Sequence, residues 1–168
     1  MPTPNAVDAP YFLLVEDSAD EIAMLLKILH EIEIALEVSV CHDGVEALDT
    51  LATAVNCTPS RLPRFVLLDI NMPRVDGFEV LRKARAVPAL EALPIVMFST
   101  SSLQEDVDRA FQCGSTAYCV KPMRYDDYAR VVASIFARWG GQIRHGAQRM
   151  EAALGDQYFR SPESPLSS

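Results

Sequence analysis

The chain has 168 residues, of which 49% are hydrophobic, and its formal net charge is -8. That length suits one compact domain with some residues to spare. The acidic balance disfavours non-specific binding to nucleic acid or to an anionic membrane, because both attract basic faces. No stretch approaches the roughly 20 apolar residues of a membrane-spanning helix, and the start MPTPNAVDAP does not resemble a secretory signal. We therefore expect a cytoplasmic protein with no nucleic-acid or membrane partner.

Short apolar runs alternate along the chain with segments of helical period. The runs cover residues 11–15, 37–41, 65–69, 94–99 and 117–120. Three of them barely alternate between apolar and polar residues, which is typical of strands buried on both faces. They predict a parallel sheet covered by helices.

The segments between the runs carry apolar residues at helical spacing. Ile22 and Leu29 bound the first such stripe, and Leu48 and Val55 the second. Shorter helices are predicted after Gly77 and around Val107, and a long one runs from Tyr128 to Trp139 before Gly140-Gly141 ends it. Five strands, each followed by a helix, indicate an α/β doubly wound domain.

The domain is expected to cover residues 10–139, with an N-terminal extension at 1–9 and a C-terminal tail at 140–168. The tail ends in the Ser/Pro-rich stretch SPESPLSS. It is too short for a winged-helix or helix-turn-helix domain, so no output domain is expected.

The four cysteines (Cys41, Cys57, Cys113 and Cys119) are far apart and form no C-x-x-C pair, which favours reduced thiols over a metal site or a disulfide.

Polar side chains stand at the carboxyl ends of the predicted strands, where ligands bind in open parallel sheets. The first strand ends in Glu16-Asp17, the third in Asp69 and the fourth in Ser99, and the fifth reaches Lys121. Singly, each has an ordinary structural interpretation; Ser18 and Glu21, for instance, fit a helix capping box. Together, carboxylates gathered within a few ångströms repel one another unless a cation is bound.

The ligand chemistry of this cluster points to Mg²⁺. Oxygen donors without nearby Cys or His suit a hard ion, and a few carboxylates with positions left for water and phosphate favour Mg²⁺ over Ca²⁺. A carboxylate beside such an ion can accept a phosphoryl group as an aspartyl phosphate, while Lys121 neutralises charge on the phosphoryl oxygens. Asp69, held rigidly by its strand, is the predicted acceptor.

Four motifs carry a resemblance to a known family. VEDS (15–18), LLDINMPRVDG (67–77), VMFSTS (96–101) and AYCVKP (117–122) resemble the landmarks of the CheY-like receiver domain of two-component response regulators, in the family's order and spacing. The resemblance implies a flavodoxin-like (βα)5 fold with a five-stranded parallel sheet of order 2-1-3-4-5.

The resemblance also implies roles for individual residues. Asp69 matches the phosphoacceptor, Glu16 and Asp17 match the acidic pair that holds Mg²⁺, and Asn71 matches the position whose backbone carbonyl contacts the metal. The resemblance further implies that Ser99 bonds the phosphoryl oxygen, that Tyr118 is the rotating switch aromatic, and that Lys121 is the cation of the site. Pro122 follows Lys121, and the bond before this proline is cis in many members of the family. Glu16 and Thr100 depart from the usual Asp and Ala, which bears on metal affinity and phosphate lifetime.

Within the family, the chain resembles single-domain regulators paired with phytochrome-type histidine kinases, through VEDSADE, STS and the ending SIFARWGG. The implied partners are a sensor histidine kinase and a second copy of the chain. Phosphorylation is expected to switch the face made by the fourth and fifth helices and the fifth strand for partner binding or dimerisation, with Trp139 as a candidate anchor.

Two other functional classes share some of these features. An aspartate-nucleophile phosphatase of the haloacid-dehalogenase type needs an acid two residues after the nucleophile, and Asn71 cannot serve as that acid. A phosphorylation-independent scaffold module is the remaining alternative, although the complete set of site residues argues against it. We therefore expect a phosphoacceptor signalling protein with slow self-hydrolysis, and not an enzyme.

Overall fold

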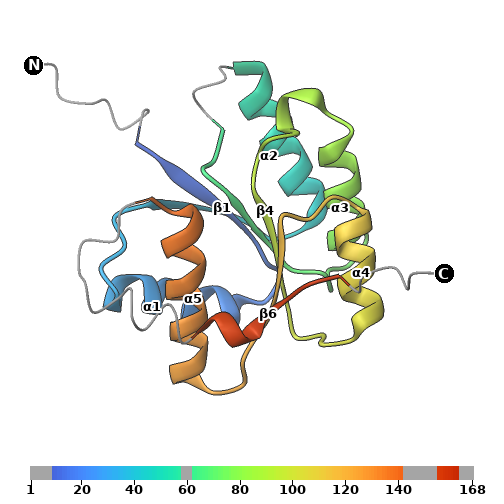
Figure 1. The fold of residues 1–168 in the computed structure, drawn as a ribbon. Coiled ribbons are helices and arrows are strands. Elements are labelled where there is room, and N and C mark those ends of the chain that lie inside the picture. Colours follow the sequence, from blue (N-terminus) through green and yellow to red (C-terminus); the bar gives the residue numbers. More distant parts are fainter. Residues whose placement is uncertain (1–8, 58–61, 142–154, 163–168) are drawn as a thin grey trace, which may run out of the picture.

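The fold was analysed in a computed structural model that describes residues 9–57, 62–141 and 155–162. Five strands alternate with five α-helices in the first two of these ranges (Figure 1). The strands are β1 (Tyr11–Val15), β2 (Glu37–Cys41), β3 (Val66–Leu68), β4 (Ile95–Ser99) and β5 (Ala117–Val120). The helices are α1 (Ala19–Glu31), α2 (Gly44–Cys57), α3 (Gly77–Arg85), α4 (Gln104–Gln112) and α5 (Tyr125–Trp139).

The strands form one sheet in the order β2-β1-β3-β4-β5-β6, in which β1 to β5 are parallel. The predicted flavodoxin-like order 2-1-3-4-5 is confirmed. Helices α1 and α5 cover one face of the sheet and α2, α3 and α4 cover the other. None of the helices in the described ranges combines the length and the apolar character that crossing a membrane requires.

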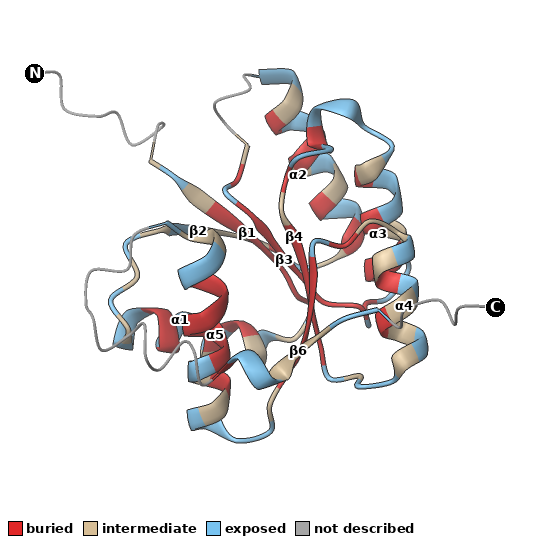
Figure 2. Ribbon diagram, in the orientation of Figure 1, coloured by how far each residue is buried: buried red, intermediate tan, exposed pale blue. Residues whose placement is uncertain are grey.

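The core consists of two layers because successive strand residues point to opposite faces. Along β1, Leu13 and Val15 pack with α2 and α3, whereas Phe12 and Leu14 pack with α1 and α5. All four side chains are buried, which explains why these runs show so little alternation in the sequence (Figure 2).

Two helix starts follow from short polar side chains. The Ser18 hydroxyl accepts a hydrogen bond from the Glu21 N–H at 3.3 Å and starts α1. The Asp76 carboxylate accepts one from the Glu79 N–H at 2.9 Å and starts α3. Each satisfies one amide of a first turn that has no partner inside its helix, so the helix begins at a defined residue.

The C-terminal region adds a strand that the sequence analysis did not predict. Within the region expected to be a tail, β6 (Phe159–Arg160) pairs antiparallel with β5, with Cys119 opposite Phe159 and Tyr118 opposite Arg160. The short helix η3 (Asp156–Tyr158) precedes it, and Figure 1 shows this segment running between α5 and α4. The segment covers the outer edge of β5, which is the last of the parallel strands in the sheet.

Side chains fasten this segment to α5 and α4. The Asp156 carboxylate accepts a hydrogen bond from the Ser134 hydroxyl at 2.5 Å and pairs with Arg138 at 3.0 Å. The ring of Phe159 lies 6.1 Å from that of Trp139, measured between centroids. Trp139, the candidate anchor for a partner, therefore contacts the chain's own C-terminal segment.

The strand pairing predicts a specific disulfide. In a background with Cys57→Ser and Cys113→Ser, we expect Phe159→Cys to oxidise with Cys119, because opposed residues of antiparallel strands lie within disulfide range. Arg160→Cys is the matched control, since its side chain points to the opposite face and should stay reduced. Non-reducing mass analysis should find the bridge within one chain. A bridge between two chains, or equal oxidation of both variants, would contradict this placement of β6.

Candidate functional site

Strand register brings the predicted acidic residues together at the carboxyl edge of the sheet. Val15 of β1 lies opposite Leu68 of β3, so Glu16 and Asp69, the next residue on each strand, follow side by side. The carboxylates of Glu16, Asp17 and Asp69 each offer an oxygen within 4.8 Å of the others. The predicted acidic cluster is therefore present as a geometric unit.

Glu16 is the most buried member of the cluster, with 5% of its surface exposed. Its Oε1 accepts a hydrogen bond from the Ser18 N–H at 3.1 Å, and its Oε2 accepts one from the Lys121 Nζ at 2.7 Å. Burial raises the pKa of Glu16 to about 7, although Lys121 acts in the opposite direction. The carboxylate therefore holds its proton far more strongly than an exposed glutamate does.

Asp69 is held by backbone contacts on two sides. Its N–H donates to the Val15 carbonyl at 3.0 Å, which extends the sheet by one residue beyond β3. On the other side the chain returns through Gly77, where a Cβ atom would lie 2.3 Å from the Asp69 carbonyl oxygen. Only glycine fits so close to that backbone, so Gly77 fixes the loop around Asp69. Burial raises the pKa of Asp69, against the effect of Lys121.

Asp17 and Asn71 lie at the solvent side of the cluster, and both are exposed. Asp17 directly follows Glu16 at the end of β1, and Asn71 stands two residues after Asp69. An exposed carboxylate beside two buried ones gives the cluster an opening toward water. The predicted role of the Asn71 carbonyl stays a prediction.

Lys121 binds the cluster from the end of β5. Its Nζ donates hydrogen bonds to Glu16 and Glu21 and lies 3.5 Å from Asp69 Oδ1. Burial acts to lower the pKa of Lys121, but Asp69 and Glu16 outweigh it, so the pKa is raised and the ammonium stays charged. The bond to Pro122 is trans, like every peptide bond in the described ranges, in contrast to the cis form that the resemblance suggests.

The side chain of Glu21 departs from the capping box that we predicted. Ser18 does accept the Glu21 N–H, but the Ser18 N–H donates to Glu16, and the Glu21 carboxylate reaches Lys121 instead. The sequence analysis therefore missed a residue of the site. The signal was the long side chain at position 16, which reaches the amide that Glu21 was expected to bind.

Ser99 is the last residue of β4 and Tyr118 is the second residue of β5, and both are fully buried. The Ser99 Oγ accepts a hydrogen bond from the Ser101 N–H at 3.1 Å, and the Tyr118 hydroxyl donates to the Ser101 carbonyl at 2.9 Å. Burial raises the pKa of Tyr118, while contacts with Ser99 and Ser101 act against it. The predicted hydroxyl and switch aromatic thus share one loop, which leads into α4.

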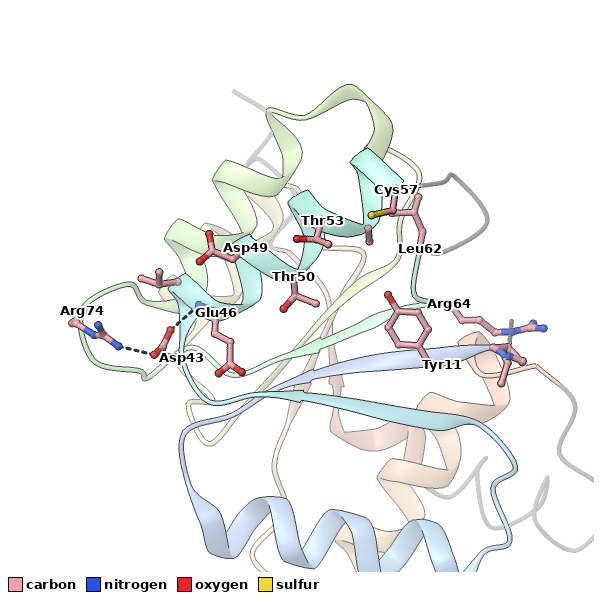
Figure 3. A pocket seen from close by; sticks show the side chains of 14 residues that line it. Tyr11, Asp43, Glu46, Asp49, Thr50, Thr53, Cys57, Leu62, Arg64 and Arg74 are labelled. Carbon is pink, nitrogen blue, oxygen red and sulfur yellow. Dashed lines mark hydrogen bonds and ion pairs between the residues drawn. The ribbon is translucent and has the colours of Figure 1, made fainter. Parts of the chain in front are cut away.

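A cavity of about 910 Å³ lies elsewhere, beside α2 and the start of β1 (Figure 3). Its lining includes Tyr11, Glu46, Asp49 and an ion pair in which Arg74 contacts Asp43 at 2.6 Å. None of the predicted site residues lines it. The chemistry at the carboxyl edge is therefore separate from this cavity.

The chain is similar to known regulators in sequence. The response regulator receiver domain matches residues 12–133. The probable methanogenesis regulatory protein FilR2 of Methanothrix harundinacea is 34% identical over 83% of this chain and 90% of that protein. Response regulator Rcp1 of Synechocystis is 31% identical over 76% of this chain and 86% of that protein.

Solved structures agree with these matches. The Mn²⁺-bound form of response regulator Rcp1 aligns with a TM-score of 0.70 and 28% identity, over 80% of this chain and 96% of that one. The phosphorylated cyanobacterial phytochrome response regulator RcpA aligns with a TM-score of 0.71 and 28% identity, over 79% and 95%.

A doubly wound α/β domain with an acidic cluster and a lysine at its carboxyl edge, matched by the receiver-domain family, is a receiver module, a signalling module rather than a classical enzyme. The chain belongs to the response regulator receiver domain family, and its relatives include phytochrome-associated regulators.

The donor set fits a hard divalent cation. The three clustered groups are carboxylates, two of them are buried, and their oxygens are close enough to share one ion. The raised pKa values of Glu16 and Asp69 mean that a proton competes for these positions.

This competition predicts a pH dependence of metal binding. Because Glu16 must lose its proton to bind the ion, we expect the apparent Mg²⁺ affinity to fall by about tenfold per unit as pH drops below about 7. Calorimetric titration with Mg²⁺ at pH 8, 7 and 6 measures it. Glu16→Gln, which has no proton to lose, should show a weaker affinity with a flatter pH profile. An affinity of the wild type that is constant over this range would contradict the assignment.

Proposed function

We propose that this protein is a two-component response regulator that accepts a phosphoryl group on Asp69 in the presence of Mg²⁺. The observation that carries the proposal is the placement of the Lys121 ammonium among the carboxylates of the acidic cluster, 3.5 Å from Asp69. The Lys121 ammonium already faces Asp69, and the negative charge that it leaves unbalanced favours the binding of a second cation.

The reaction is a phosphoryl transfer between two nucleophiles. An Asp69 carboxylate oxygen attacks the phosphorus of a phosphohistidine on a sensor histidine kinase and forms a new P–O bond. The P–N bond breaks, and its electron pair stays on the imidazole. Mg²⁺, held by Glu16, Asp17, Asp69 and the Asn71 carbonyl, supplies positive charge to the phosphoryl oxygens when bound.

Two side chains of the protein recognise the product. The Lys121 ammonium bonds a phosphoryl oxygen and balances part of the new charge. The Ser99 hydroxyl, on the adjoining strand, bonds another oxygen after turning away from the Ser101 N–H that it now contacts. Slow hydrolysis of the acyl phosphate returns the site to its starting state.

The output surface is the face of α4, β5 and α5. A turn of Ser99 changes the packing around Tyr118, whose hydroxyl contacts the loop before α4, so the event at Asp69 alters that face. Resemblance to phytochrome-associated regulators supports a phytochrome-type kinase as the donor and dimerisation or partner binding through this face. Residues 155–162 cover part of it in the described structure, so a partner has to accommodate or displace them.

The scaffold alternative makes an opposite prediction about labelling. We expect purified protein with Mg²⁺ and acetyl phosphate to gain the mass of one phosphoryl group, and Asp69→Asn to gain none, because the amide is no nucleophile. Intact-mass spectrometry measures both. Asp49→Asn, an exposed carboxylate on α2, is the matched control and should label like the wild type. Equal labelling of Asp69→Asn, or no labelling of any variant, would refute the proposal.

Self-association is tested separately. Beryllofluoride mimics a phosphoryl group, and with Mg²⁺ we expect it to raise the mass of the protein in solution from monomer toward dimer. Light scattering after size-exclusion chromatography measures this change, with Asp69→Asn as a control that should not respond. A monomer in both states would exclude dimerisation as the output and leave partner binding.

A further inference from the structure

The ammonium of Lys121 faces three carboxylates but forms hydrogen bonds with only two of them. It donates hydrogen bonds to Glu16 and Glu21, and Asp69 lies farther away, at 3.5 Å. The side chain of Lys121 is only 5% exposed, so water contributes little to its solvation. The carboxylates therefore compete for it, and in this arrangement the acceptor Asp69 receives the weakest contact.

Glu21 reaches Lys121 from the first turn of α1. A glutamate at that position normally turns back to the amide of the helix cap. Here the Ser18 N–H already donates to Glu16 Oε1, which leaves the Glu21 carboxylate without its local partner. Its contact with Lys121 joins residues 100 positions apart in the sequence and ties α1 to the end of β5.

Glu21 differs from the other partners of Lys121 in its relation to the acidic cluster. The oxygens that lie within 4.8 Å of one another belong to Glu16, Asp17 and Asp69, and Glu21 is not among them. A cation held by the cluster would engage Glu16 and Asp69 and would leave Glu21 with its full charge. Glu21 would then be the carboxylate that still holds the ammonium when a phosphoryl donor arrives.

We propose that Glu21 is a positioning residue that holds Lys121 away from Asp69 and so limits the rate at which Asp69 accepts a phosphoryl group. This proposal rests on the proposed phosphoacceptor function and assigns to Glu21 a role in setting the rate of phosphoryl transfer to Asp69. Glu21 withholds part of the ammonium from the charged oxygens of the transition state.

The step is testable with acetyl phosphate as the donor. An Asp69 oxygen attacks phosphorus, the P–O bond to the acetyl group breaks, and the electron pair leaves on acetate, so no further reactant is needed. Glu21→Gln keeps the size of the side chain and removes its charge. Because Glu21 is about one-third exposed, with 31% of its side chain accessible, screening reduces the effect. We expect labelling about threefold to tenfold faster than in the wild type, in line with the loss of a partly screened charged hydrogen bond.

Two matched variants separate this role from helix capping. Asp20→Asn removes a charge from the same turn of α1, at a residue outside the bonds that hold Lys121, and should label like the wild type. Glu21→Asp keeps the charge in that turn but is too short to keep the contact with Lys121, so it should label faster than the wild type. Melting temperatures identify any variant that is merely unfolded.

A double-mutant cycle provides the readout that a purely structural role would not move. In a Lys121→Met background, Glu21→Gln should leave the labelling rate unchanged, since the ammonium through which Glu21 acts is gone. Equal rates for wild type and Glu21→Gln, equal acceleration by Asp20→Asn, or an effect that persists without Lys121 would each overturn the inference. Absence of labelling in the wild type would instead refute the proposed function, so the two failures are distinguishable.

Discussion

One buried ammonium at the carboxyl edge of the sheet makes the arrangement of acidic side chains tolerable. Glu16 and Asp69 are both largely removed from water, and burial raises the pKa of each carboxyl group. Without Lys121 their mutual repulsion would add to the cost of desolvation. With it, the cluster folds as a site that is only partly neutralised, and the residual negative charge favours a divalent cation.

The carboxyl edge of the sheet also adjoins the elements α4, β5 and α5, which form the proposed output face. Lys121 directly follows β5, and Tyr118 lies three residues earlier, within that strand, with its hydroxyl donating to the Ser101 carbonyl before α4. β5 pairs with β4 on one side and with β6 of the C-terminal segment on the other. In the proposed function, a phosphoryl group on Asp69 acts on this strand, which contacts both the rest of the sheet and the C-terminal segment.

Similarity to known proteins identifies the family and its phosphoacceptor chemistry, but it does not identify the kinase or the target of this chain. The similar proteins include phytochrome-associated regulators and a probable methanogenesis regulator, so proteins with this domain differ in their biological roles. The residues proposed to carry the chemistry lie at or next to strand ends, whereas surface residues determine which kinase and which target bind. Glu21 contacts Lys121 at the site, and the C-terminal segment pairs with β5, the strand that precedes Lys121.

The sequence by itself determined the alternation of five strands with five helices and the positions of Glu16, Asp17, Asp69, Ser99 and Lys121 at or beside predicted strand ends, while the strand order 2-1-3-4-5 came from the family resemblance. Apolar runs and helical stripes are local patterns, and parallel topology carries strand ends to the same side. Tertiary structure decided the rest. Glu21 left its cap for Lys121 because Glu16 took the amide it would have bound, and β6 formed because β5 offered an unpaired edge; both depend on groups brought close only by folding.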